Sequence, residues 1–374
     1  MNPAAFFADY DAFGERRTGG EGDAAAAAWL HARAAATGAA AVLVAVPFTR
    51  FTPGAARLEA GGAVFEGLPL FDGGLTAGIS GALGPLGSDA PIGFAEMDPA
   101  AASLPGNAFA RARADSRHAG IVVALRTKPD GLAPLNAHDA EAPFGPPVLQ
   151  VAGRDSLRIG VLAEAGAAAR LVVDGLRAPG LTHNIRAALP GAAPPLVLLT
   201  PRTSWWTSTA ERGGGVLAWL TALQALAGAK RARGVVALAT CGHELGHIGA
   251  HRAFGAEPAL VAEAPVVIHL GANLGTAEDE RLTVRSNVVG LAQRMAEALV
   301  AAGHPAPPLE VVTGGTANGE AHEVEHRGGR YLSLIGKNPW FHAPEDRWPV
   351  SVDCARAGAI AQAVAAMAVD LAAR

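Results

Sequence analysis

The chain has 374 residues, of which 50% are hydrophobic and 17% are charged. This length predicts about two domains, because a single hydrophobic core rarely grows beyond about 250–300 residues. The hydrophobic content excludes an intrinsically disordered chain. Lys and Arg number 30 and Asp and Glu number 34, and the net charge of −4 excludes a general electrostatic attraction to nucleic acid or to an acidic membrane.

The chain carries no sequence signal for secretion or membrane insertion. Residues 1–17 contain no basic segment followed by an apolar run, and the Ala-rich stretches 24–28 and 34–41 are too short to span a bilayer. Two cysteines, Cys241 and Cys354, are too few for a disulfide framework or a Cys-based zinc site. We therefore expect a soluble, cytoplasmic protein that contacts neither membranes nor nucleic acid.

The first half of the chain predicts a helix, a strand and then a small β-rich insert. Residues 22–37 are Ala-rich and typical of a surface helix, and the apolar run Ala41–Phe48 is typical of a buried strand. From residue 56 to 178, short apolar runs alternate with Gly and Pro, which predicts short strands joined by turns. The clearest of these strands are 120–125, 146–151 and 169–175, with one helix at 156–166.

The second half predicts an α/β domain, because strands and helices alternate. The predicted strands are 195–200, 234–240, 264–271 and 331–336, and the predicted helices are 215–228, 287–303 and 354–373. This alternation indicates a mostly parallel sheet with helices on both faces. Ligands of such sheets bind beyond the carboxyl ends of the strands. Candidate site residues are therefore expected in four segments, namely Pro201–Glu211, Cys241–His247, Gly271–Gly275 and Lys337–Asp346.

The histidines are concentrated in the second half, with eight of twelve between residues 243 and 342. His243 to His247 spells H-E-x-x-H, which on a helix binds zinc through two imidazoles. Here a strand and a glycine precede the motif, which places Glu244 at a strand-to-helix turn. The plainer interpretation is that His247 and His251 are surface residues of a helix. A zinc hydrolase that uses His243 and His247 stays open as an alternative.

Several strand-end segments together resemble the co-catalytic zinc aminopeptidase family, which includes the glutaminyl cyclases and the transferrin receptor ectodomain. The most specific match is Trp340–Asp346 (WFHAPED), and weaker matches are Thr240–Gly249, Glu211–Val216 and the strand segment 146–153. The resemblance implies an α/β fold in which a mostly parallel mixed sheet is flanked by helices. It assigns residues 1–55 and 179–374 to this fold, and 56–178 to a smaller β-rich insert that resembles a protease-associated domain.

Four of the six metal-site positions of that family hold a different residue here. The altered positions are Pro201–Ser204 in place of a His, Glu211 in place of the bridging Asp, His243 in place of the general-base Glu, and Gly271 in place of an Asp. Glu244 and His342 match the family. The resemblance therefore implies that both ligands exclusive to the first metal are missing.

The resulting hypothesis is a metal-dependent hydrolase of an amide or peptide-like bond that uses one divalent ion, zinc by expectation. Glu211, Glu244 and His342 bind the ion, which leaves the open fourth position that a catalytic zinc requires. His243 takes the proton of the bound water, since its unperturbed pKa of about 6.5 lies near neutral pH. The expected partner is a small amide or peptide-like substrate, and a second copy of the chain is left open.

Other interpretations of these residues remain. Glu211 also suits the first turn of a helix, where the dipole favours an acid. A catalytically inactive binding or assembly module is the competing class, because the transferrin receptor shows that this fold persists without metals. Trp205 and Trp206 form either an aromatic substrate wall or packing under the insert. The charged segment Glu320–His326 is interpreted as a solvated face rather than as part of the pocket.

Overall fold

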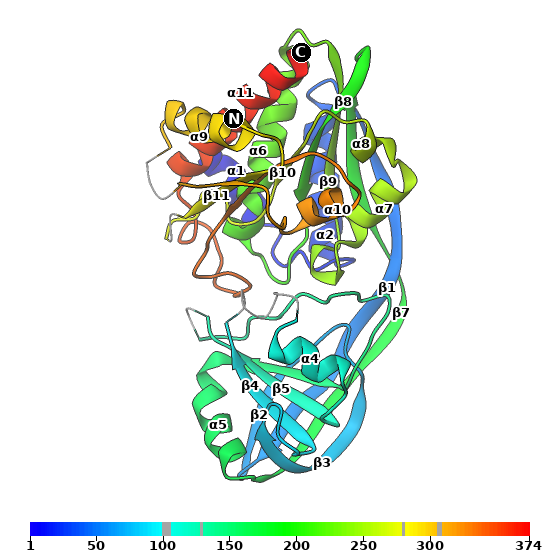
Figure 1. The fold of residues 1–374 in the computed structure, drawn as a ribbon, viewed down its shortest axis with the longest axis vertical. Helices are drawn as coiled ribbons and strands as arrows, with labels where there is room; N and C mark the ends of the chain where they lie inside the picture. The colour runs from blue at the N-terminus through cyan, green and yellow to red at the C-terminus, as the bar shows by residue number, and fades with distance from the viewer. Residues whose placement is uncertain (99–105, 128–129, 279–280, 305–308) are drawn as a thin grey trace.

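The computed structural model describes residues 1–98, 106–127, 130–278, 281–304 and 309–374. Figure 1 shows a larger lobe that holds both chain termini, a smaller lobe below it, and two long strands that run through both. These strands are β1 (Ala40–Ala60) and β7 (Ala168–Leu189), which pair antiparallel from Ala40 opposite Ala188 to Ala60 opposite Ala169. The two lobes therefore share a continuous two-stranded ribbon.

A mixed sheet forms the centre of the larger lobe. Its further strands are β8 (Ala193–Pro201), β9 (Arg233–Thr240), β10 (Val267–Leu270), β11 (Leu282–Ser286), β12 (Leu309–Thr313) and β13 (Tyr331–Gly336). The central strands β9-β8-β10-β13 are parallel, and β7 and β11 flank them antiparallel. This arrangement confirms the predicted fold class, an α/β fold with a mostly parallel mixed sheet flanked by helices.

Helices cover both faces of this sheet, because successive residues of a strand point to opposite sides. On one face lie α1 (Pro3–Asp11), α2 (Glu21–Ala35), α6 (Thr209–Gly228), α9 (Leu291–Ala301) and α11 (Cys354–Ala373). On the other lie α7 (Ile248–Ala256), α8 (Ala259–Ala262) and α10 (Glu320–His326). Leu196 and Leu198 of β8 pack with the first group, and Val197 and Leu199 pack with the second.

The last helix, α11, has the bounds predicted from the sequence. Its length and composition would suffice to cross a membrane, but in this fold Ile360 and Val364 lie in the core and the helix packs against α6. Its apolar character is therefore explained by burial against neighbouring helices.

The described strands of the smaller lobe close into a ring, in the order β1-β2-β6-β5-β4-β3-β7 and back to β1. Its own elements are β2 (Ala63–Pro69), β3 (Thr76–Pro85), β4 (Ile92–Met97), β5 (Gly120–Leu125), β6 (Val148–Ala152), α4 (Ala108–Ala114) and α5 (Ser156–Glu164). Sequence patterns found α5 but missed α4. The expected domain boundaries, 55/56 and 178/179, fall within β1 and β7, so the division into domains and the likeness to a protease-associated domain stay predictions.

One strand is less buried than its sequence indicates. Residues 41–48 do form the start of β1, but Val42, Leu43 and Val44 are 49%, 40% and 40% exposed. The expectation of a buried strand here was wrong, because among the described residues this stretch pairs with β7 alone and lies at the sheet edge. An apolar run cannot by itself distinguish a central strand from an edge strand.

Asp11 at the end of α1 connects three segments of the larger lobe. Its carboxylate accepts hydrogen bonds from the Thr209 side chain at the start of α6, the Trp348 backbone amide (2.9 Å) and the Arg347 guanidinium (2.7 Å). Burial alone would raise the pKa of Asp11, but the bonds from Arg347 and Thr209 outweigh it and hold the pKa below 3.8. The carboxylate is therefore stabilised in its charged form.

We predict that Asp11→Asn lowers the free energy of unfolding at neutral pH by about 1–3 kcal/mol, because a buried carboxylate loses charge-assisted hydrogen bonds. The lowered pKa means that this contribution is complete above pH 3.8 and disappears as the pH falls through the folded-state value. Urea unfolding at several pH values measures it. The control is Asp9→Asn, whose pair with Arg33 is largely exposed and should contribute little. Equal stability of Asp11→Asn and wild type at neutral pH would contradict the prediction.

Candidate functional site

Buried polar side chains meet where the central strands end at their carboxyl side. Glu211 and Arg212 lie in the first turn of α6, which follows β8. His243 and Glu244 lie in a 3-10 turn, η2 (His243–Leu245), which follows β9. His342 lies in the loop after β13. The expected strand-end segments contribute Glu211, His243, Glu244 and His342, whereas Arg212 lies one residue beyond the expected segment and was not predicted.

The start of α6 is fixed by contacts from distant loops. Asp346 accepts hydrogen bonds from the backbone amides of Ala210 and Glu211, both at 2.9 Å, and so caps the helix from another segment. Gly214 packs so closely that a Cβ there would lie 1.6 Å from the carbonyl oxygen of Leu274. These contacts hold the first turn of α6 against the loops that follow β10 and β13. They explain why the helix begins at Thr209, before the predicted residue 215.

Arg212 lies between the two glutamates. Its NH2 group is 2.8 Å from Oε1 of Glu211 and 3.6 Å from Oε1 of Glu244. Its Nε donates a 2.7 Å hydrogen bond to the backbone carbonyl of Thr203, just after β8. One end of the guanidinium is thus held by a hydrogen bond and the other lies against a carboxylate, and the side chain is fully buried.

The two carboxylates respond differently to this guanidinium. Burial raises the pKa of Glu244 to about 7, although the Arg212 charge opposes the rise. Burial also acts on Glu211, but there the charge of Arg212 outweighs it and lowers the pKa. Oε2 of Glu244 accepts bonds from the hydroxyls of Thr203 (2.9 Å) and Thr18 (3.2 Å). Glu211 and Arg212 are therefore the principal ion pair.

His342 completes this group, which we call the strand-end cluster (Glu211, Arg212, Glu244 and His342). Its Nε2 lies 3.5 Å from Oε1 of Glu211, and its Nδ1 lies 2.6 Å from the carbonyl oxygen of Pro134. Pro134 belongs to the segment that leads from β5 to β6 in the smaller lobe, and Ala137 of that segment donates a 2.8 Å bond to the backbone carbonyl of Glu244. The smaller lobe therefore covers the cluster.

The three predicted metal ligands, Glu211, Glu244 and His342, are thus brought together, but they do not fit a metal ion as they stand. Both carboxylate oxygens of Glu211, Oε1 of Glu244 and Nε2 of His342 are buried without a hydrogen-bond partner among the described residues, as at an ion site. However, the guanidinium of Arg212 already lies between the carboxylates. A zinc ion bound to these oxygens at about 2.0–2.2 Å would contact that permanent cation.

A second group of ligand-type side chains adjoins the first, and we call it the histidine cluster (His243, His247 and Glu320). One donor atom from each lies within 4.8 Å of the others. Nδ1 of His243 is 2.8 Å from Oε1 of Glu320, and the rings of His243 and His247 are 4.9 Å apart. Burial lowers the pKa of His243 to about 4. Its imidazole is therefore neutral at pH 7.

Glu320 is held by residues of two strands. Its Oε2 lies 3.3 Å from Nε2 of His269 in β10, whose Nδ1 lies 2.8 Å from the hydroxyl of Ser333 in β13. Glu320 and His269 are fully buried. Burial would raise the pKa of Glu320, but the interaction with His243 and the hydrogen bonds from both histidines hold it well below its usual range. The interpretation of 320–326 as a solvated face was therefore wrong for its first residue.

The H-E-x-x-H segment brings its two histidines together without being an α-helix. The 3-10 turn η2 ends at Leu245, and Gly246 and His247 then adopt positive φ angles of 88° and 56° before α7 begins at Ile248. These two left-handed residues turn the chain back, so that His247 faces His243. The interpretation of His247 and His251 as surface residues of a helix holds for His251, which is exposed. It does not hold for His247, which is half-buried and precedes α7.

Trp205 packs under the smaller lobe, as one of its two interpretations predicts. It is fully buried, its ring meets that of Phe71 edge-on at 4.7 Å, and its Nε1 donates to Asn136 at 2.9 Å. A cavity of about 120 Å³ beside it reaches Glu244. Trp206 donates to the backbone carbonyl of His342 at 2.9 Å. Trp206 therefore helps to fix the loop that carries His342, and Trp205 fixes the segment of the smaller lobe around Asn136.

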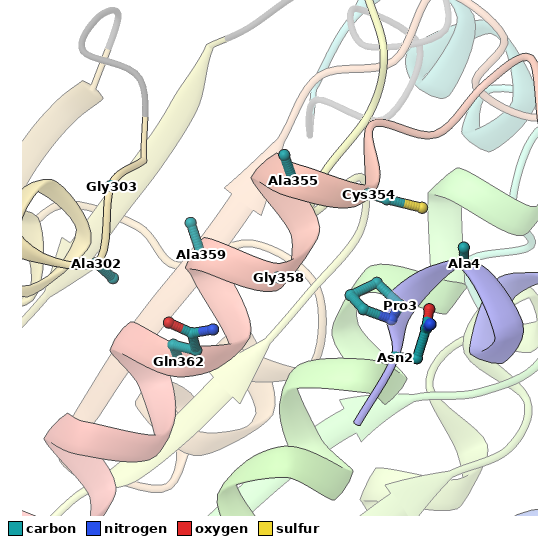
Figure 2. A pocket seen from close by; sticks show the side chains of 10 residues that line it. All are labelled: Asn2, Pro3, Ala4, Ala302, Gly303, Cys354, Ala355, Gly358, Ala359 and Gln362. Carbon is teal, nitrogen blue, oxygen red and sulfur yellow. The ribbon is translucent and has the colours of Figure 1, made fainter.

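A larger hollow, of about 390 Å³, lies elsewhere, between the N-terminus, α9 and α11. Figure 2 shows its small side chains, among them Ala302, Ala355 and Ala359, together with the amides of Asn2 and Gln362. None of the described residues that line it is acidic, basic or a histidine. Its one titratable side chain among the described residues is the thiol of Cys354, whose pKa is raised by burial.

No protein-family model matches the chain, and no curated protein matches it by sequence. Solved structures do match. An aminopeptidase from Aneurinibacillus sp. strain AM-1 has 15% identity and a TM-score of 0.76, over 100% of this chain and 93% of that one. A zinc aminopeptidase from Bacillus subtilis has 15% identity and a TM-score of 0.75, over 97% of this chain and 93% of that one. A peptidase M28 precursor from Shewanella amazonensis has 17% identity and a TM-score of 0.75, over 99% of this chain and 92% of that one.

At these identities the likeness establishes the fold, and it extends over both lobes. The chain therefore has the fold of the zinc aminopeptidases, as the resemblance of its strand-end segments implied.

Proposed function

We propose that the protein is a hydrolase of an amide or peptide-like bond that depends on one divalent metal ion, zinc by expectation. The ion is assigned to His243, His247 and Glu320. The observation that carries this proposal is the convergence of their donor atoms within 4.8 Å. Two imidazoles, one carboxylate and an open fourth position form a typical catalytic zinc site. The likeness to zinc aminopeptidases supports a substrate with an amide bond.

The surroundings of the histidine cluster also support metal binding. A metal-bound carboxylate is normally oriented by hydrogen bonds from behind, and His269 with Ser333 supplies them for Glu320. His243 is neutral at pH 7, as a metal-binding imidazole must be. His247 is half-buried, so the histidine cluster reaches the protein surface at this residue.

Each residue has a defined part under this proposal. A bound divalent ion would lower the pKa of a water molecule and so supply hydroxide at neutral pH. His243 then acts as a ligand and not as the base first assigned to it, because its metal-binding nitrogen is unavailable for a proton. The carboxylate of Glu244 points toward Arg212 and Thr203. The strand-end cluster, with Glu211, Glu244 and His342, forms the adjacent wall.

We predict that the protein, purified without chelators, contains one equivalent of zinc or another divalent ion. His247→Ala and Glu320→Gln should abolish binding, because each removes a ligand. Glu211→Gln and His342→Ala should retain the ion, and so should the control His251→Ala, which changes an exposed histidine on α7. Elemental analysis of folded variants measures the stoichiometry.

The opposite pattern, with loss of metal in His342→Ala and retention in His247→Ala, would restore the ligand set Glu211, Glu244 and His342. Absence of metal after incubation with excess zinc would favour the inactive binding module and exclude the hydrolase.

We also predict a specific requirement for glycine before Glu320. Gly319 has φ 60° and ψ −149°, a conformation that is essentially restricted to glycine, and a Cβ there would lie 3.2 Å from Cε1 of His269. Gly319→Ala should therefore displace Glu320 and weaken zinc binding by roughly 10–100-fold. The control is Gly328→Ala, which also has positive φ but has open space around it. Zinc titration compares the two variants, and equal affinities would contradict the proposed role of Glu320.

A further inference from the structure

We infer that the guanidinium of Arg212 takes the place of a metal ion in the strand-end cluster and keeps closed a latent cation site formed by Glu211, Glu244 and His342. The cluster is thus held together by a cation that belongs to the chain. This inference concerns the strand-end cluster alone and does not depend on metal binding by the histidine cluster.

The first argument is the charge of the buried groups. Glu211 and Glu244 are both buried, and a desolvated carboxylate is strongly unfavourable unless a cation lies beside it. The NH2 group of Arg212 lies 2.8 Å from one carboxylate and 3.6 Å from the other. It therefore provides the bridging positive charge that a metal ion would otherwise supply.

The second argument is the orientation of His342. Its Nδ1 lies 2.6 Å from the carbonyl oxygen of Pro134, which only accepts hydrogen bonds, so Nδ1 carries the proton. In the neutral ring Nε2 then presents a lone pair, and this lone pair faces Oε1 of Glu211 at 3.5 Å. Two acceptors that face each other in a buried site require a positive charge nearby, and Arg212 provides it.

The third argument is that Arg212 is positioned independently of the carboxylates. Its Nε donates to the Thr203 carbonyl at 2.7 Å, in the loop after β8. The segment around Pro134 covers the cluster from the smaller lobe. Because an arginine stays charged at all accessible pH values, this cation cannot be removed by a chelator or by titration.

The test replaces the guanidinium by an uncharged side chain of similar length, Arg212→Met. We use a His247→Ala background throughout, so that ions bound at the histidine cluster do not contribute. Without metal, Arg212→Met leaves the carboxylates uncompensated, and its melting temperature should fall below that of the background. When it is refolded with zinc, it should gain one equivalent and recover its melting temperature, whereas the background protein gains none.

Two further variants make the result specific. Adding His342→Ala to Arg212→Met should abolish the gained zinc, because a ligand of the latent site is lost. Adding Glu211→Gln to Arg212→Met removes one negative charge with the positive one, so this variant should fold without metal.

Three outcomes would overturn the inference. The first is a folded Arg212→Met variant that gains no zinc. The second is a background protein that already binds zinc through His342. The third is failure of Arg212→Met to fold with zinc present, although the variant that also carries Glu211→Gln folds.

Discussion

The buried guanidinium of Arg212 between Glu211 and Glu244 is the interaction on which the rest of the site depends. Arg212 reaches the two carboxylates only because α6 begins at Thr209, where Asp346 caps its first amides and Gly214 allows close contact with the loop after β10. Charges removed from water must be compensated locally, because protein surroundings cannot solvate them. Arg212 therefore connects the start of α6 to the loop after β8, where its Nε bonds to Thr203, and to Glu244 after β9.

Because of this ion pair, the two adjacent clusters differ in whether they already contain a positive charge. The short turn η2 directs Glu244 toward Arg212 and His243 toward Glu320. The strand-end cluster already contains a cation, whereas the histidine cluster offers neutral imidazoles and a carboxylate.

Much of the fold was predictable from the sequence, but the site was predictable only in part. Periodicity located the central strands and α11, because these elements are long and regularly apolar. The strand-end resemblance found Glu244 and His342, since the loops that carry them follow predictable strands. Arg212 and Glu320 were missed because charged residues at helix starts are normally exposed, and their burial arises from contacts distant in sequence. The H-E-x-x-H pattern paired His243 with His247 as one alternative, but through an α-helix, whereas positive φ angles at Gly246 and His247 bring the two rings together.

The most direct test of this account is a crystal structure of the wild-type protein, grown with zinc, with diffraction data recorded on both sides of the zinc absorption edge. We predict an anomalous peak among His243, His247 and Glu320, and no peak between Glu211 and Glu244, where the guanidinium of Arg212 should lie. A zinc peak bound by Glu211, Glu244 and His342, with Arg212 displaced, would contradict the account.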